Sequence, residues 1–186
     1  LNEQGISEAE QAVDLLENIN FDIAFTSKLK RANDTLDIIL KGIKQTSIPV
    51  EKNLALNERD YGDLIGQNKA EAAKEFGEEQ VQIWRRSYDI PPPGGESLKD
   101  TADRVIPYLN EKILPHVIEG KNVIVSAHGN SIRAIVMALK GFSSEEILQT
   151  EIGWCEPWIF EFEGNKLTNL EIKSRPGSKS MSKLPN

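Results

Sequence analysis

The apolar residues of this chain follow two alternating patterns, short continuous runs and stripes that recur every three to four residues. The continuous runs at 21–27 and 123–127 are rich in β-branched and aromatic residues, which is typical of buried strands. The stripes over 6–18, 29–42 and 132–139 are typical of amphipathic helices that bury one face. Strands that alternate with helices predict an α/β fold with a mostly parallel sheet.

The middle of the chain, from about residue 57 to residue 96, is more polar and less regular. Short helices are predicted over 69–76 and 78–87, and the run Pro91-Pro92-Pro93-Gly94-Gly95 then forces a loop. Ahead of this segment, the apolar residues of 50–56 alternate with polar ones and predict a short extended stretch.

Ser97, followed three positions later by Asp100, resembles a capping box and predicts a helix from 98 to about 114. Pro107 falls inside this helix, where it removes a hydrogen-bond donor, so we expect a kink there. Another short helix is predicted after Ser144.

Strands over 158–163 and 166–173, joined by a Gly-Asn turn, predict a hairpin near the end of the chain. Residues 174–186 are rich in Lys, Ser, Pro and Gly and predict a flexible tail. The pattern as a whole predicts one three-layer α/β/α domain over residues 1–173, built around a mostly parallel mixed sheet.

Candidate chemistry lies at two of the predicted strand ends, where α/β sheets bind their ligands. Ser27 ends one strand and is followed by Arg31, while His128 ends another strand at the turn into a helix. The free N–H groups at a helix start attract anions, phosphate above all. The alternative is a polar turn that only caps the helix, together with an Arg31 that is simply solvated.

Two further segments carry groups that suit phosphate chemistry. Glu58 lies between an apolar segment and a glycine, and a carboxylate there is able to act as a general acid or base. Arg85 and Arg86 lie between aromatic residues, and each guanidinium can grip a phosphate or carboxylate through two hydrogen bonds. The alternatives are a turn with local ion pairs and a solvated helix end.

The composition narrows the function classes. A chain of 186 residues with 39% apolar and 27% charged residues is typical of one soluble domain. The net charge of −7 argues against nucleic-acid binding, although local arginines can still make one cleft attractive to anions. No apolar run approaches ~20 residues, so no membrane span is predicted. A lone Cys155 and the lack of a recognisable signal peptide favour the cytoplasm.

Taken together, six segments resemble the cofactor-dependent phosphoglycerate mutases of the histidine phosphatase superfamily. The match runs in chain order from residue 1 to about residue 150. The segments are Ala24–Ala32, Leu56–Gly62, Gly66–Lys69, Glu78–Tyr88, Gly95–Thr101 and Ala127–Ser131.

The resemblance implies that the protein interconverts 3- and 2-phosphoglycerate through a phosphohistidine, primed by 2,3-bisphosphoglycerate and without a metal. Glu58 matches the proton donor and acceptor of the family, and His128 matches a second histidine that stabilises the transferring phosphoryl group. The residues that match substrate contacts are Arg31, Arg59, Asp60, Tyr61, Lys69, Arg85, Arg86, Gly129 and Asn130. Phosphoryl transfer needs positive groups and a proton shuttle, which these residue types supply. The implied partner is a small phosphorylated molecule, with a homodimer as a candidate assembly.

One departure from the family concerns the reacting histidine, which in the family lies in an Arg-His-Gly triplet ending the first strand. This chain has two histidines, His116 and His128, and neither has that setting; it also begins at Leu1 rather than at a methionine. A parallel sheet without an interior strand leaves several unpaired N–H and C=O groups, each costing about 1–3 kcal/mol when buried. Since a typical domain is stable by roughly 5–15 kcal/mol, we expect that strand to belong to the molecule but to lie outside residues 1–186.

Two smaller departures concern the outside of the fold. Only a short connection separates Arg86 from Gly95, where longer mutases carry a larger insert. Subunit contacts that involve this insert in the family are therefore not expected here. The segment Gly153–Pro157 replaces the Thr-Gly step expected before the penultimate strand, so the edge of the sheet is expected to differ there.

Two other functions remain open. A histidine-type phosphatase would use water as the acceptor, but the Leu56–Gly62 and Trp84–Tyr88 motifs argue against it, since hydrolysis needs no grip on a second phosphate. A catalytically dead module that binds phosphorylated metabolites would keep the arginines and lack the nucleophile. For the leading hypothesis, we expect five side chains to converge on one cleft; they are Arg31, Glu58, Arg85, Arg86 and His128.

Overall fold

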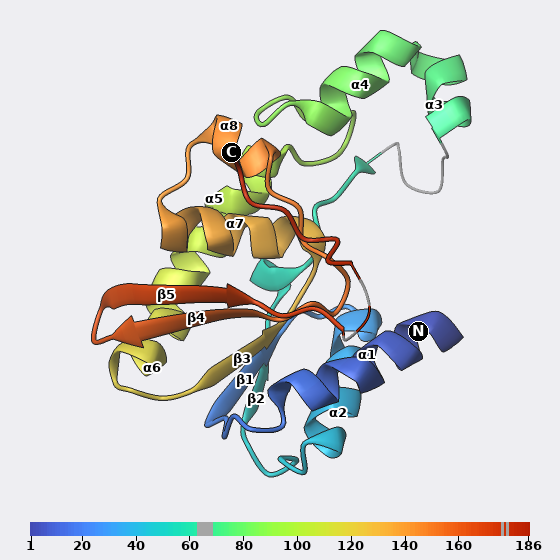
Figure 1. Ribbon diagram of the computed structural model, residues 1–186. Coiled ribbons are helices and arrows are strands. Elements are labelled where there is room, and N and C mark those ends of the chain that lie inside the picture. Colours follow the sequence, from blue (N-terminus) through green and yellow to red (C-terminus); the bar gives the residue numbers. More distant parts are fainter. Residues whose placement is uncertain (63–68, 176, 178) are drawn as a thin grey trace.

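The computed structural model of the protein describes residues 1–62, 69–175, 177 and 179–186 (Figure 1). The helices are α1 (Glu3–Leu16), α2 (Lys30–Gly42), α3 (Lys69–Phe76), α4 (Glu78–Arg86), α5 (Leu98–Tyr108), α6 (Leu114–Ile118), α7 (Gly129–Lys140) and α8 (Ser144–Leu148). The strands are β1 (Ile23–Thr26), β2 (Val50–Lys52), β3 (Val123–Ser126), β4 (Trp158–Glu163) and β5 (Lys166–Ile172). None of the described helices combines the length and the apolar content needed to cross a membrane.

β1 is the central strand of a three-stranded parallel sheet with the order β2-β1-β3. Its Ala24 is in register with Val50 of β2 and Ile124 of β3, and all four residues of β1 are buried. β4 and β5 form a separate antiparallel pair. The predictions of a parallel sheet and of a hairpin near the end of the chain are confirmed.

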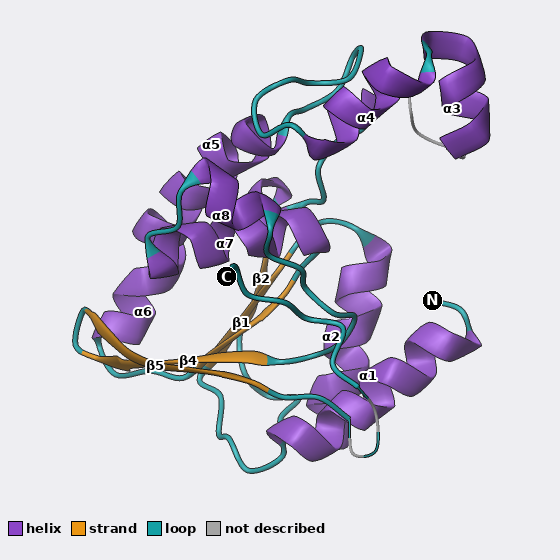
Figure 2. Ribbon diagram, turned by 45° about the horizontal axis from the view of Figure 1, so that its top comes forward, coloured by secondary structure: helices purple, strands orange, loops and turns teal. Residues whose placement is uncertain are grey.

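The sheet lies between two helical layers, as Figures 1 and 2 show from two directions. Because side chains alternate across a strand, Ile23 and Phe25 of β1 face one layer and Ala24 faces the other. The first pair packs against α5 and α7, where Val105 is fully buried, while Ala24 packs against α1 and α2, where Leu36 is buried. This is the three-layer α/β/α arrangement that the sequence predicts.

A hollow of about 1300 Å³ lies between β3 and the β4–β5 hairpin. Residues 123–127 form one wall and residues 158–163 another, while α1 and α7 contribute apolar side chains such as Leu16 and Ile135. Within the described residues, neither of these two strand edges pairs with a further strand. A hollow of this size is unusual, because protein interiors are closely packed. β3 therefore combines the sequence of an interior strand with the surroundings of an edge strand.

The prediction of an extended segment over 50–56 is wrong in its second half. β2 stops at Lys52, and Leu54–Leu56 form a 3-10 turn. The reason is Asn53, whose side-chain oxygen accepts the N–H of Ala55 at 2.8 Å and so caps the turn. The turn places Leu56 in the core and directs the following residues toward the carboxyl ends of the strands.

The helix predicted over 98–114 changes geometry instead of continuing as one α-helix. It begins with the predicted capping box, in which the N–H of Asp100 donates to Ser97 Oγ and the N–H of Ser97 donates to Asp100 Oδ2. α5 ends at Tyr108, and a π-helix spans Leu109–Ile113. Pro107 has no N–H for the preceding turn, so the α-helical hydrogen-bond ladder is interrupted beside the π-helix.

Part of the segment 174–186, for which the composition predicts a flexible tail, contacts the rest of the chain. The main chains of Glu151 and Lys183 form an antiparallel bridge through two hydrogen bonds of 2.9 Å. Ser182 donates its hydroxyl to the buried carboxylate of Glu156 at 2.7 Å. A buried carboxylate needs hydrogen-bond donors, and the tail supplies them. No local pattern in the sequence indicates this long-range pairing.

Candidate active site

Ser27 and His128 meet beyond the carboxyl ends of β1 and β3. Thr26 lies opposite Ser126 in the parallel register, so the residues that follow them come close together. Ser27 Oγ lies 2.8 Å from Nε2 of His128, and both residues are buried. The N–H of Leu29 donates to the same Ser27 oxygen at 3.1 Å. The expectation that these two strand ends meet is confirmed.

His128 is the N-cap residue of α7, and its main-chain N–H donates to Ser131 Oγ at 3.1 Å. Burial lowers the pKa of His128 to about 4, and the positive charges of Arg31 and Arg104 act in the same direction. The imidazole is therefore neutral near pH 7. A neutral ring with one N–H, beside the free N–H groups of a helix start, suits the oxygens of a phosphoryl group.

Glu58 reaches the same helix start from the loop that follows the 3-10 turn. Its Oε1 accepts the N–H of Asn130 at 3.1 Å and the N–H of Arg59 at 2.9 Å. Its Oε2 would lie 3.8 Å from a Cβ placed on Gly129. The Glu58 carboxylate thus contacts the two residues that directly follow His128.

Three of the five residues expected to converge line the same hollow, namely Arg31, Glu58 and His128. The other two, Arg85 and Arg86, end α4, which belongs to a lobe set away from the sheet (Figure 1). Arg86 is exposed there, and the side chain of Arg85 lies outside the described part of the structure. For these two arginines convergence stays a prediction.

α3 and α4 pack around a small hydrophobic cluster of their own. Its buried members include Val81 and Trp84, and the ring of Phe76 lies edge-on to Trp84 with a centroid distance of 5.1 Å. Lys69 opens α3, but its side chain is not among those described, and Gly66 lies outside the described residues.

Asn130 and Tyr61 are joined by a hydrogen bond in which the Asn130 amide donates to the phenol oxygen at 2.9 Å. Arg133, one turn further along α7, donates to the Asn130 side-chain oxygen at 3.2 Å and to the Thr150 carbonyl at 2.8 Å. Arg133 therefore fixes the orientation of the Asn130 amide. No sequence motif indicates this role, although the three-residue spacing on a helix allows the contact.

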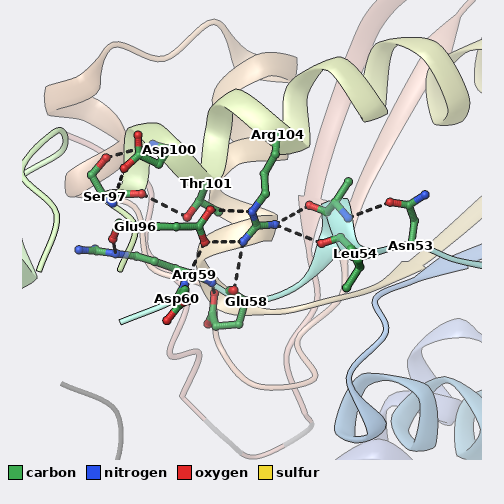
Figure 3. A network of polar contacts seen from close by, with 11 residues as sticks. Asn53, Leu54, Glu58, Arg59, Asp60, Glu96, Ser97, Asp100, Thr101 and Arg104 are labelled. Atoms are coloured by element: carbon green, nitrogen blue, oxygen red, sulfur yellow. Dashed lines mark hydrogen bonds and ion pairs between the residues drawn. The ribbon is translucent and has the colours of Figure 1, made fainter. Parts of the chain in front are cut away.

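Arg59 is buried, and its guanidinium donates to two main-chain oxygens. The acceptors are the carbonyls of Glu96 and Trp84, each at 2.8 Å, and the guanidinium carbon lies 4.9 Å from the centre of the Tyr61 ring. Figure 3 shows Arg59 beside the loop of Glu58. These contacts tie the Glu58 loop to α4 and to the segment before α5; substrate contact by Arg59 stays a prediction.

Asp60 and Gly62 form a tight turn in the same loop. The Asp60 side chain accepts the N–H of Gly62 at 2.7 Å, and Asp60 is exposed. Gly62 has a φ of +57°, and a Cβ there would collide with the carbonyl of Pro93 and lie 2.5 Å from the nitrogen of Gly95. Gly62 and Gly95 are therefore required as glycines, because the loop that carries Glu58 and the loop before α5 approach each other closely.

Comparison with known proteins agrees with this fold. The structure resembles YhfR from Bacillus stearothermophilus with a TM-score of 0.79 and 21% identity, over 97% of this chain and 85% of that one. It also resembles a mycobacterial glucosyl-3-phosphoglycerate phosphatase with a TM-score of 0.77 and 24% identity, over 93% and 86% of the two chains. At these identities the likeness concerns the fold alone. The profile of the histidine phosphatase superfamily (branch 1) matches residues 1–174.

Sequence relatives define the group more narrowly. A 2,3-bisphosphoglycerate-dependent phosphoglycerate mutase from Nitrobacter hamburgensis is 57% identical over 162 residues, which are 86% of this chain and 78% of the relative. A protein of the same name from Bradyrhizobium sp. (strain BTAi1) is 52% identical over 174 residues, or 92% and 84% of the two chains. The chain belongs to the histidine phosphatase superfamily, within the family of 2,3-bisphosphoglycerate-dependent phosphoglycerate mutases.

Proposed function

We propose that this protein interconverts 3-phosphoglycerate and 2-phosphoglycerate through a phosphohistidine intermediate, as a phosphoglycerate mutase. The observation that carries the proposal is the Glu58 carboxylate bonded to the Asn130 N–H, at a helix start capped by His128. This contact supports a proton shuttle beside an anion site. The names of the relatives from Nitrobacter and Bradyrhizobium support the same activity.

In this proposal the start of α7 holds the phosphoryl group during transfer. The neutral imidazole of His128 and the N–H of Gly129 donate to its oxygens, while Arg31 balances its negative charge. Glu58 takes a proton from the attacking hydroxyl or gives one to the leaving oxygen. Arg31, Glu58 and His128 line one hollow, which supports this assignment of roles.

The histidine that carries the phosphoryl group belongs, in this proposal, to a strand in the hollow between β3 and β4, outside residues 1–186. The hollow of about 1300 Å³ and the two unpaired strand edges within the described residues support this placement. A strand parallel to β3 would end at the level of His128, because the carboxyl ends of parallel strands meet at one edge of a sheet. It would also pair the exposed edge of β3.

The proposal assigns substrate binding to residues on both sides of this centre. Arg31, Gly129 and Asn130 contact the transferring group, and the remaining contacts come from the Glu58 loop and the α3–α4 lobe; they are Arg59, Asp60, Tyr61, Lys69, Arg85 and Arg86. The donor set around α7 fits a phosphate group of 2,3-bisphosphoglycerate, which when bound supplies the phosphoryl group that primes the reacting histidine. The reaction needs no metal ion. We place the protein in the cytoplasm, with a homodimer as a candidate assembly.

The test is to supply the purified natural protein with 3-phosphoglycerate and a trace of 2,3-bisphosphoglycerate, and to follow the products by phosphorus NMR. A mutase forms 2-phosphoglycerate without a matching release of inorganic phosphate. Inorganic phosphate as the main product would instead identify a phosphatase, and binding without either product would identify a non-catalytic module. Glu58→Gln serves as the control that removes the proton shuttle and keeps the shape of the side chain.

A further inference from the structure

The loop that carries Glu58 has no regular structure of its own between the 3-10 turn Leu54–Leu56 and Gly62. The position of a carboxylate on such a loop therefore depends on the contacts that hold the main chain of the loop. Glu58 bonds to the start of α7 through its side chain, but its main chain is held by residues of α5 and of the segment before it (Figure 3).

Arg104 of α5 bonds to this loop and to the 3-10 turn that precedes it. Its Nη1 donates to the carbonyl of Ala55 at 2.7 Å, and its Nη2 donates to the carbonyl of Glu58 at 3.1 Å. The same guanidinium forms a two-pronged ion pair with Glu96, with Nε–Oε2 at 2.8 Å and Nη2–Oε1 at 2.9 Å. A planar fork with five N–H donors can span these acceptors together, whereas a lysine ammonium cannot.

Glu96 holds the other side of the loop. Its Oε1 accepts the N–H of Asp60 at 3.0 Å, and its own N–H donates to the carbonyl of Asp60. Burial raises the pKa of Glu96, but hydrogen bonds from Arg104 and from the Asp60 main chain outweigh this effect, so its pKa lies below the usual value. Glu96 is therefore ionised near pH 7, and the pair grips the loop on both sides of Glu58.

Arg104 and Glu96 are held by the well-packed start of α5. The capping box of Ser97 and Asp100 fixes the start of α5, and Ala102 and Val105 of α5 are buried against the layer that includes α7. α7 in turn carries His128. Arg104 thus links the Glu58 main chain to the same packed layer that carries the other half of the site.

We propose that Arg104, held by Glu96, is a positioning residue that sets the Glu58 carboxylate against the start of α7. This deepens the proposed function, since it rests on Glu58 being the proton shuttle. About a quarter of each side chain in the pair is exposed. Water can therefore solvate the groups left behind when the pair is removed, and we expect variants at these positions to fold.

The Asn130 amide gives a readout that does not depend on turnover. It lies in the first turn of α7, where an N–H has no acceptor within the helix, and its acceptor is Glu58 Oε1. Hydrogen exchange at this amide, measured by NMR, therefore reports the contact directly. Arg104→Met keeps the apolar stem of the side chain and removes every donor, and we expect exchange at Asn130 to rise about tenfold or more.

Arg104→Lys separates geometry from charge. A role through charge alone predicts that Lys restores the protection of the Asn130 amide, whereas the two-pronged geometry predicts that most of the loss persists. The matched control is Lys99→Met, which breaks an exposed ion pair with Asp103 on the same helix at 2.9 Å. This control should leave exchange at Asn130 unchanged.

A double-mutant cycle with Glu58→Ala decides between positioning and general support of the fold. If Arg104 acts through Glu58, adding Arg104→Met to Glu58→Ala changes exchange at Asn130 by less than about twofold. Equal, additive effects, or a matching rise in exchange at core amides such as that of Phe25, would overturn the proposal.

Turnover supplies a second, independent readout. In a mutase, Arg104→Met should lower kcat by roughly 10–100-fold with KM within about threefold, because misplacement of a reacting group costs rate more than binding. A rise in KM with unchanged kcat would contradict the positioning role. If the protein proves to have no mutase activity, the exchange cycle still tests the contact, so the two failures are distinguishable.

Discussion

The His128 centre and the α3–α4 lobe both carry residues expected to contact substrate, but the two regions are built differently. At the centre, Ser27 and His128 follow directly from the buried core of the sheet, and Glu58 is bonded to the same helix start. The lobe has a small cluster of its own around Val81 and Trp84 and lies away from the sheet (Figure 1).

The difference indicates a division of labour. Groups that stabilise a transition state must be held within a fraction of an ångström, and the core provides that rigidity. Groups that grip a distal phosphate tolerate more movement, and a lobe with few buried contacts opens more readily than a core. We therefore expect changes at the centre to act on turnover and changes in the lobe to act on ligand affinity.

The largest effect is expected at the centre, for Glu58→Gln in the complete enzyme. The change keeps the shape of the side chain and removes the proton shuttle, so turnover should fall by roughly 10²–10⁴ while substrate binding changes far less. Steady-state kinetics over a range of pH measure both quantities. Unchanged turnover at every pH would remove Glu58 from the mechanism.

In the lobe, Arg85→Ala should weaken binding of a doubly phosphorylated ligand by roughly 10–100-fold and binding of inorganic phosphate much less. The reason is that an arginine on α4 meets the distal phosphate in our account and not the transferring group. Calorimetric titration with 2,3-bisphosphoglycerate and with phosphate makes the comparison. Equal losses for the two ligands would assign Arg85 to the reaction centre. They would also contradict the proposed difference between the centre and the lobe.

The third effect concerns the acid stability of the centre. The pKa of His128, about 4, lies below its ordinary value of 6.5, so the unfolded chain binds a proton more readily than the folded protein. His128 therefore contributes stability that is fully present above pH about 6.5 and is lost as pH falls toward about 4, by about 1 kcal/mol per pH unit.

His128→Gln isolates this contribution. Urea unfolding at several pH values should show a shallower loss of stability in the variant than in the parent protein between pH about 6.5 and about 4. Parallel curves for the two proteins over this range would show that His128 titrates normally.

The sequence predicted the centre better than it predicted the connections around it. Strongly apolar segments such as 123–127 correctly predicted the strands. Because the carboxyl ends of parallel strands meet at one edge of a sheet, the contact between Ser27 and His128 could also be predicted. The 3-10 turn after β2 depends on one Asn53 contact that competes with the extended conformation, and apolar alternation does not detect it.

Long-range polar contacts could not be predicted from the sequence, for a different reason. Arg104 is a charged residue on an amphipathic helix, and in sequence it cannot be distinguished from a solvated arginine. Its partners lie 46 and 49 positions away at Glu58 and Ala55. The docking of Ser182 on Glu156 is equally invisible, because local composition alone predicts a flexible tail there.

The most direct test of the account is to locate the phosphorylated histidine. The natural protein is incubated briefly with 2,3-bisphosphoglycerate, and acid-labile phosphate is mapped by mass spectrometry of its peptides. We expect phosphohistidine on a peptide that contains neither His116 nor His128, and none when residues 1–186 are produced alone. Phosphohistidine at His128 in a cooperatively folded protein would contradict this expectation, because His128 would then be the nucleophile and not the group that stabilises the transfer.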